Sequence, residues 1–264
     1  MAPVPEKPVL VRLYFGAHSF LDGLTRFLSL IHSGFWLGVL TRQHLHAISE
    51  TAYEQNRKYW TDEYNKSGLW GWESRVVERD FAGCKRLLLA GAGGGREVLA
   101  LRRRGLEVDG FEANPGLVRF ANELLEREGL APDVRLASWD QSLEYEGKYD
   151  GVIVGWGAYM HIRGRDKRVT FLHSLRERVE VGAPILLSFY IMGGSSGFLR
   201  RVSRIGNVLA RMLGRERVEV GDRLTPDYVH FFNRKQIESE LAEGGFGLTT
   251  FETAEYGHAI GRAV

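Results

Sequence analysis

The sequence predicts an α/β protein in which a doubly wound parallel sheet follows a helical N-terminal segment. Two observations carry this prediction. Short apolar runs alternate with longer stretches of helical periodicity between residues 86 and 190, which is typical of βαβ units around a parallel sheet. A glycine-rich turn separates the first run from the helix behind it. Such a turn commonly marks a ligand site at the carboxyl end of the sheet.

The opening βαβ unit covers residues 85–114. Arg86–Ala90 is an apolar run that suits a strand buried on both faces, and it leads into the glycine turn 91–95 and a helix. A second strand, Leu106–Phe111, ends on Glu112. Glycines let a ligand lie directly against the main chain, and the N–H groups at the start of the helix are unpaired. Because a carboxylate at the second strand tip can accept both ribose hydroxyls, the unit predicts a nucleotide-type site.

The glycine turn resembles motif I of class I S-adenosylmethionine (SAM)-dependent methyltransferases. Arg96 stands where the dinucleotide fingerprint G-x-G-x-x-G has its last glycine. The resemblance implies SAM as the cofactor, S-adenosyl-L-homocysteine as the product, and a ribose held by Glu112. It implies a cofactor contact for four further residues, which are Gly91, Gly93, Gly95 and Ala113.

The remaining core elements continue the alternation. Asn114 and Pro115 indicate an N-cap and first helical position, and Asn233–Gln236 is a plausible capping box for a late helix. Further strands are predicted at 134–137, 149–155, 185–190, 246–252 and 256–262. A helix followed by two terminal strands resembles the ending of the seven-stranded class I methyltransferase sheet. The resemblance therefore spans roughly residues 75–264.

Five residues beyond the third and fourth strands are candidates for the site. By the resemblance, Asp140 accepts a hydrogen bond from the adenine amino group, and Trp139 beside it forms a wall for the ring. Trp156 either lines the pocket or packs in the core. Tyr159 and His161 stand where many class I enzymes keep substrate-facing residues, and His161 is the best candidate for a general base because imidazole titrates near neutral pH. Structural roles are the alternative for all five.

The segments outside the core domain have several open roles. Residues 1–9 are predicted to be a disordered tail, and residues 10–75 a helical cap with apolar residues at helical spacing from Phe20 to Ile31. This cap is a packing element, a lid over cofactor and substrate, or an interfacial membrane helix. Within the predicted domain 76–264, residues 194–230 form a basic insert or lid between the fifth strand, at 185–190, and the sixth, at 246–252. Its basic face at 198–218 is solvated, contacts an acidic substrate, or meets a membrane surface or partner.

Composition narrows the functional classes. The net charge of +2 is too small to imply nucleic-acid binding. No apolar stretch is long enough for a membrane span, and the absence of a secretory signal predicts a cytoplasmic protein. The single cysteine excludes internal disulfides, and the histidines show no metal-ligand pattern.

Missing signatures narrow the acceptor. The segment after the fourth strand, residues 155–159, lacks the Asn/Asp-Pro-Pro-aromatic signature of nucleobase amino-methyltransferases and the carboxylate of the magnesium-dependent catechol type. The predicted function is a SAM-dependent methyltransferase acting on a small-molecule or peptide acceptor, with oxygen favoured over nitrogen. The alternatives are a catalytically silent binding or scaffold protein with this fold, and an NAD-linked oxidoreductase.

Overall fold

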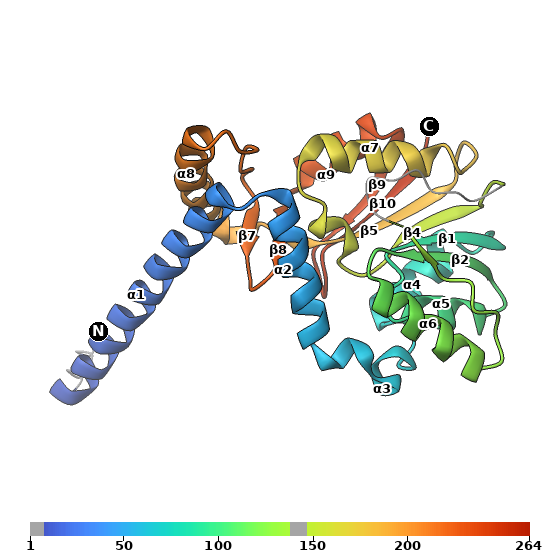
Figure 1. Cartoon of the computed structure of the whole chain (residues 1–264), viewed down its shortest axis with the longest axis horizontal. Coiled ribbons are helices and arrows are strands. Elements are labelled where there is room, and N and C mark those ends of the chain that lie inside the picture. The colour runs from blue at the N-terminus through green and yellow to red at the C-terminus, as the bar shows by residue number, and fades with distance from the viewer. Residues whose placement is uncertain (1–7, 138–146) are drawn as a thin grey trace, which may run out of the picture. The chain divides into compact units, whose positions relative to one another are not determined.

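The structure is a computed structural model that describes residues 8–137 and 147–264 (Figure 1). It divides into two compact units. The smaller unit comprises Met1–Thr41 and Ser195–Arg223, and the larger comprises Arg42–Gly194 and Leu224–Val264. The boundary at Thr41 lies within the predicted cap 10–75, so the cap contributes helices to both units.

The larger unit is built on a seven-stranded sheet with the order β3-β2-β1-β4-β5-β10-β9. Its strands are β1 (Arg86–Ala90), β2 (Glu107–Glu112), β3 (Arg135–Leu136), β4 (Gly151–Val154), β5 (Pro184–Ser188), β9 (Phe246–Glu252) and β10 (His258–Ala263). The first five pair in parallel, whereas β10 runs antiparallel to both β5 and β9. This topology confirms the predicted doubly wound sheet and the strand pair at its end. The strand order reverses between β1 and β4, which places a ligand crevice at their carboxyl ends.

Strand β1 lies inside the sheet, between β2 and β4, and is buried on both faces. Leu88 and Ala90 belong to one hydrophobic cluster, whereas Leu87 and Leu89 belong to the other. Successive side chains of a strand point to opposite faces, so an uninterrupted apolar run is what a strand covered on both sides requires.

Helices cover both faces of the sheet (Figure 1). Helices α4 (Gly71–Asp80), α5 (Arg96–Arg102) and α6 (Pro115–Arg127) contribute to one cluster, and α7 (Arg165–Arg176) and α9 (Arg234–Glu243) contribute to the other. The two predicted caps are confirmed, because Asn114 accepts from the backbone at the start of α6 and Asn233 forms a capping box with Gln236 at the start of α9.

The predicted helical cap 10–75 contains several separate elements. After α1 (Val9–Val39) it continues as α2 (Arg42–Gln55), the 3₁₀ turn η1 (Arg57–Trp60) and α3 (Asp62–Asn65). Helix α4 crosses the boundary predicted at residue 75 between the cap and the core domain. The remaining elements are the 3₁₀ turns η2 (Ala158–His161) and η3 (Gly193–Ser195), and strands β6 (Tyr190–Ile191), β7 (Asp222–Leu224) and β8 (Tyr228–Phe232). Strand β8 pairs in parallel with β6 in a separate small sheet.

The smaller unit contains α1 (Val9–Val39) and α8 (Ser196–Met212), which pack closely through glycine. A Cβ on Gly34 would lie 2.8 Å from Ile205 Cβ, and one on Gly38 would lie 2.5 Å from the Gly206 carbonyl oxygen. These positions therefore require glycine for the two backbones to meet. Among the described residues, no helix has both the length and the apolar character needed to cross a membrane.

Candidate cofactor and acceptor site

A cavity of about 480 Å³ opens in the larger unit at the carboxyl ends of β1, β2 and β4. The glycine turn 91–94, residues 112–114 and Trp156 line it on the sheet side. Tyr53, Tyr59, Tyr64 and Asn65 line it from the segment that precedes the sheet. Three separate parts of the prediction, the glycine turn, Glu112 with Ala113, and Trp156, therefore meet around one hollow.

The glycine turn presents bare backbone to this cavity. Gly93 has a φ of 53°, in the left-handed region that favours glycine, and a Cβ there would meet no heavy atom within 4 Å. Gly95 differs from the prediction, because it is the N-cap of α5 and a Cβ on it would lie 3.2 Å from Ala121 Cβ on α6. Gly91 and Gly93 therefore line the cavity, whereas Gly95 permits close packing between two helices.

Glu112 is held rigidly at the tip of β2. Its side chain is buried, and its carboxylate accepts hydrogen bonds from the N–H groups of Gly93 (2.8 Å), Ala113 (2.8 Å) and Asn114 (2.9 Å). Burial raises the pKa of this carboxyl, and the three backbone donors oppose the shift without cancelling it. The same carboxylate therefore shapes the glycine turn and lines the cavity.

Among the described residues, the buried polar atoms of the cavity wall that have no hydrogen-bond partner include Asn65 Oδ1 and Trp156 Nε1. The orientation of the Asn65 amide is fixed, because its Nδ2 donates to the carbonyls of Tyr59 and Thr61, each at 2.9 Å. Its oxygen consequently faces the glycine turn, where a Cβ on Gly94 would lie 2.6 Å from it. Orphaned buried polar atoms are rare, and these two mark places where a ligand can complete the hydrogen bonding.

Arg96 explains the departure from the dinucleotide fingerprint. It is buried at the start of α5, pairs with Glu73 at 2.7 Å and Glu97 at 2.8 Å, and stacks over Trp70 at 4.2 Å. Glu97 also accepts from the backbone N–H of Trp156 at 3.0 Å. Arg96 and Glu97 therefore join α4 and α5 to the end of β4, and both residues line the cavity.

A second cavity of about 800 Å³ adjoins the first. Tyr53, Tyr59, Trp156 and His161 line both cavities, so these four side chains form the boundary between them. Asp227 is the one carboxylate among the described residues that line the second cavity. The rest of its lining mixes aromatic and aliphatic side chains with uncharged polar ones, which is typical of a site for a small organic molecule.

His161 has the geometry of a general base at this boundary. Its Nδ1 lies 2.8 Å from the carbonyl oxygen of Tyr228 and 3.6 Å from Asp227 Oδ2. A carbonyl can only accept, so we assign the proton to Nδ1, and Nε2 is left as an acceptor 3.4 Å from the Tyr53 hydroxyl. Burial lowers the pKa of His161, and Asp227 partly opposes this shift. The imidazole is therefore neutral at pH 7 and carries its lone pair on Nε2.

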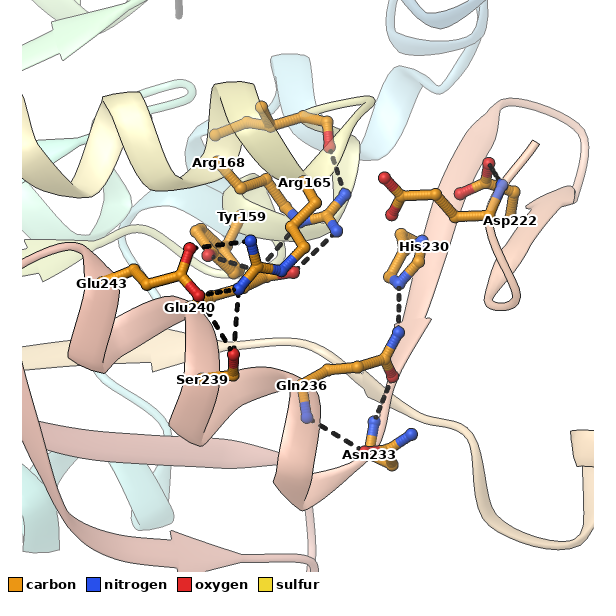
Figure 2. A network of polar contacts seen from close by, with 12 residues as sticks. Tyr159, Arg165, Arg168, Asp222, His230, Asn233, Gln236, Ser239, Glu240 and Glu243 are labelled. Atoms are coloured by element: carbon orange, nitrogen blue, oxygen red, sulfur yellow. Dashed lines mark hydrogen bonds and ion pairs between the residues drawn. The ribbon is translucent and has the colours of Figure 1, made fainter. Parts of the chain in front are cut away.

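Tyr159 differs from the predicted substrate-facing position. Its side chain is fully buried and its hydroxyl donates to Glu240 at 2.7 Å, while Arg168 binds both carboxylate oxygens of Glu240 at 2.9 and 2.7 Å (Figure 2). This network attaches η2 to α7 and α9, and η2 ends on His161. Tyr159 thus supports the element that positions His161.

Several site residues were not predictable in these roles. Asn65 and Asp227 are far from the glycine turn in sequence, and neither forms part of a recognisable motif. Tyr53 lies within the predicted cap 10–75, but its contact with His161 depends on where α2 ends. The predicted adenine contacts, Trp139 and Asp140, lie outside the described residues.

No protein-family model matches this sequence, and no curated protein matches it either. Solved structures do match. A 1,6-didemethyltoxoflavin N1-methyltransferase from Burkholderia thailandensis, with its acceptor and S-adenosylhomocysteine bound, has a TM-score of 0.59 and 16% identity, covering 86% of this chain and 92% of that one. A SAM-bound amino pentose methyltransferase of calicheamicin biosynthesis from Micromonospora echinaspora has a TM-score of 0.54 and 15% identity, covering 82% and 97%.

A sugar N-methyltransferase from a Streptoalloteichus species is similar to the same degree, with a TM-score of 0.55 and 15% identity over 81% of this chain and 92% of that one. These likenesses show that the chain has the fold of class I SAM-dependent methyltransferases. The predicted fold class is therefore confirmed.

Proposed function

We propose that this protein is a SAM-dependent methyltransferase that acts on a small-molecule acceptor. One observation carries the proposal. The bare glycine turn and the Glu112 carboxylate border one cavity, and that cavity adjoins a second one at His161. Cofactor and acceptor can thus lie on either side of a shared boundary, which is the arrangement that transfer between two bound reactants requires.

The residues of the first cavity fit SAM. Glu112 would accept hydrogen bonds from the ribose hydroxyls, and the backbone at Gly93 would contact the methionyl part. Asn65 Oδ1 is an unpaired acceptor beside the glycine turn, so it suits the α-ammonium group. Asp140 and Trp139 are proposed to bind the adenine ring. When bound, SAM supplies an electrophilic methyl group.

The acceptor is proposed to be a hydroxyl in the second cavity. A hydroxyl is a weak nucleophile until its proton is removed, and His161 offers a neutral Nε2 for that proton. The Tyr228 carbonyl and Asp227 hold Nδ1–H, so they fix the tautomer and stabilise the imidazolium that forms. Tyr53 and Trp156 enclose the boundary and exclude water from it.

An amine acceptor is the second candidate. Asp227 in the second cavity suits a cationic amine before it loses its proton, and Tyr59 and Tyr190 offer aromatic faces to such a cation. Two of the similar solved structures are an amino pentose methyltransferase and a sugar N-methyltransferase. Oxygen remains the first choice because a built general base gains most with a hydroxyl acceptor.

The proposal is tested by titration calorimetry followed by an acceptor screen. We expect micromolar binding of SAM and S-adenosylhomocysteine, no binding of NADH, and loss of SAM binding in Gly93→Arg, which fills the space beside the turn. Gly68→Arg is the matched control, because Gly68 also has a positive φ, of 82°, and open space around it. A screen of alcohols, phenols and amines that detects S-adenosylhomocysteine then identifies the acceptor. Binding of NADH without SAM would refute the cofactor assignment, and SAM binding without turnover would favour the silent-scaffold alternative.

A further inference from the structure

Helix α1 presents an apolar face that no described residue of its own unit covers. The buried residues of α1 are Ser33, Gly34, Leu37 and Gly38, all in its last turns, where α8 packs. Large apolar side chains recur at spacings of three, four and seven along the rest of the helix and are exposed, with 69% of Phe20 and 57% of Phe27 accessible. They are Leu10, Leu13, Phe20, Leu24, Phe27, Leu28 and Ile31. This spacing places them on one side of the helix.

The charged residues of α1 lie away from this apolar row. Arg12, Asp22 and Arg26 fall on the other sides of the helix together with Ser19, where exposed Val11 and Phe15 interrupt them. The row from Leu10 to Ile31 is therefore the continuous apolar face of a helix whose charges lie elsewhere. A helix of this kind with an uncovered apolar face is suited to lie in the plane of a lipid–water interface.

The charge of the smaller unit is strongly positive. Helix α8 carries exposed Arg200, Arg201, Arg204 and Arg211 and has no acidic residue in its sequence Ser196–Met212. Residues 1–41 and 195–223 hold ten Lys or Arg against five Asp or Glu, a net charge of +5. The whole chain has 35 Lys or Arg and 33 Asp or Glu, so the larger unit holds 25 basic and 28 acidic residues, a net charge of −3. The near-neutral chain thus combines a basic unit with an acidic one.

We propose that the smaller unit is a docking surface for an anionic lipid bilayer. The apolar face of α1 inserts among the acyl chains near the headgroups, and the arginines of α8 attract anionic headgroups. The positive net charge of the smaller unit favours an anionic bilayer over a second copy of the chain as the partner of this surface. Two copies meeting through this unit would bring two net charges of +5 together, whereas an anionic surface neutralises them. The proposal does not depend on the proposed methyltransferase activity.

The test is vesicle co-sedimentation of the full chain. Vesicles of phosphatidylcholine with 30% phosphatidylglycerol are compared with vesicles of phosphatidylcholine alone, at low and at 0.5 M NaCl. We expect binding to the anionic vesicles, at least tenfold weaker binding to the neutral ones, and a marked decrease at high salt.

Matched double variants separate insertion from charge. Phe20→Glu/Phe27→Glu and Ser19→Glu/Arg26→Gln each lower the net charge by two at exposed positions seven residues apart. The first pair lies on the apolar face and the second lies away from it. We expect the phenylalanine pair to weaken binding by at least about 100-fold, because two large side chains no longer leave water. The control pair should weaken it by roughly 20-fold or less. Arg200→Gln/Arg204→Gln should cause a similar small loss and a weaker salt dependence.

The outcomes are distinct. Circular dichroism spectra and SAM affinities equal to those of the wild type show that each variant is folded. Failure of the wild-type chain to bind anionic vesicles, or equal losses in the two matched variants, would refute the proposal. Light scattering that finds a dimer dissociated by Phe20→Glu/Phe27→Glu, without vesicle binding, would assign the apolar face to a second copy instead. Failure of the wild-type chain to bind SAM would count against the proposed function and leave this inference unaffected.

Discussion

Glu112→Gln removes the charge at the tip of β2 while keeping the size of the side chain. In the structure one carboxylate oxygen accepts from Gly93 and the other accepts from both Ala113 and Asn114. An amide has one oxygen, so one of these positions must receive an NH₂ group. If the oxygen stays with Ala113 and Asn114, the NH₂ opposes the Gly93 N–H, and both donors lack a partner.

The magnitude follows from these contacts. An unsatisfied buried donor costs about 1–3 kcal/mol, and a hydrogen bond to a charged acceptor contributes about 1.5–3 kcal/mol. The first cost falls on the folded protein with or without SAM and therefore lowers its stability. The second is lost from the ribose and lowers SAM affinity, by roughly 10-fold or more for a loss of about 1.5 kcal/mol.

The pH dependence gives an independent readout. Burial raises the pKa of Glu112, so its carboxylate is protonated at a higher pH than that of an exposed glutamate. SAM affinity should therefore fall as the pH drops through this raised pKa, and Glu112→Gln should lack that decline. Titration calorimetry from pH 5 to pH 8 measures both effects, with Glu107→Gln at the exposed start of β2 as the control. Binding by Glu112→Gln within threefold of the wild type would refute the reasoning.

Three further predictions concern the acceptor side and the buried network. His161→Ala should keep SAM affinity and lower methyl transfer by at least ~100-fold, and near-normal turnover in this variant would remove the base role. In the wild type, the acid limb of the pH profile of kcat/KM should lie below the ordinary histidine pKa, because burial lowers the pKa of His161. Asp227→Asn should lower kcat about tenfold and move the acid limb of the kcat/KM profile to still lower pH, since Asp227 raises the pKa of His161. An acid limb at the wild-type pH would contradict the electrostatic coupling between Asp227 and His161. Glu240→Ala leaves Arg168 buried without its partner and should cost about 3–5 kcal/mol of unfolding free energy in urea melts. Glu243→Ala removes an exposed partner of Arg165 and should cost less than about 1 kcal/mol of unfolding free energy. Equal losses of unfolding free energy in the two variants would show that burial does not determine the loss.

The sequence predicted the sheet because its signals are local. The run Leu87–Ala90 must be apolar throughout because both faces of the sheet are covered, and the caps at Asn114 and Asn233 act within three residues. The cofactor side of the site is likewise local, since the glycine turn and Glu112 lie at the ends of adjacent strands.

The acceptor side could not be predicted in the same way. Asp227 reaches His161 from 66 positions away in the chain, and Tyr53 reaches it from 108 positions away. A single sequence contains no periodicity that reports such contacts. Tyr159 was misplaced for a related reason, because its position two residues before His161 does not reveal that its hydroxyl points to Glu240 on α9.

The glycine contacts between α1 and α8 have a consequence for biosynthesis. Helix α1 ends at Val39 and α8 begins at Ser196, so the ribosome adds 156 residues between them. At ordinary translation rates of 5–20 residues per second, this takes roughly 8 to 30 s. During that interval the nascent helix has neither the surface formed by Ile205 and Gly206 nor any other helix of its unit to meet, and chaperones that recognise exposed apolar segments have time to engage it.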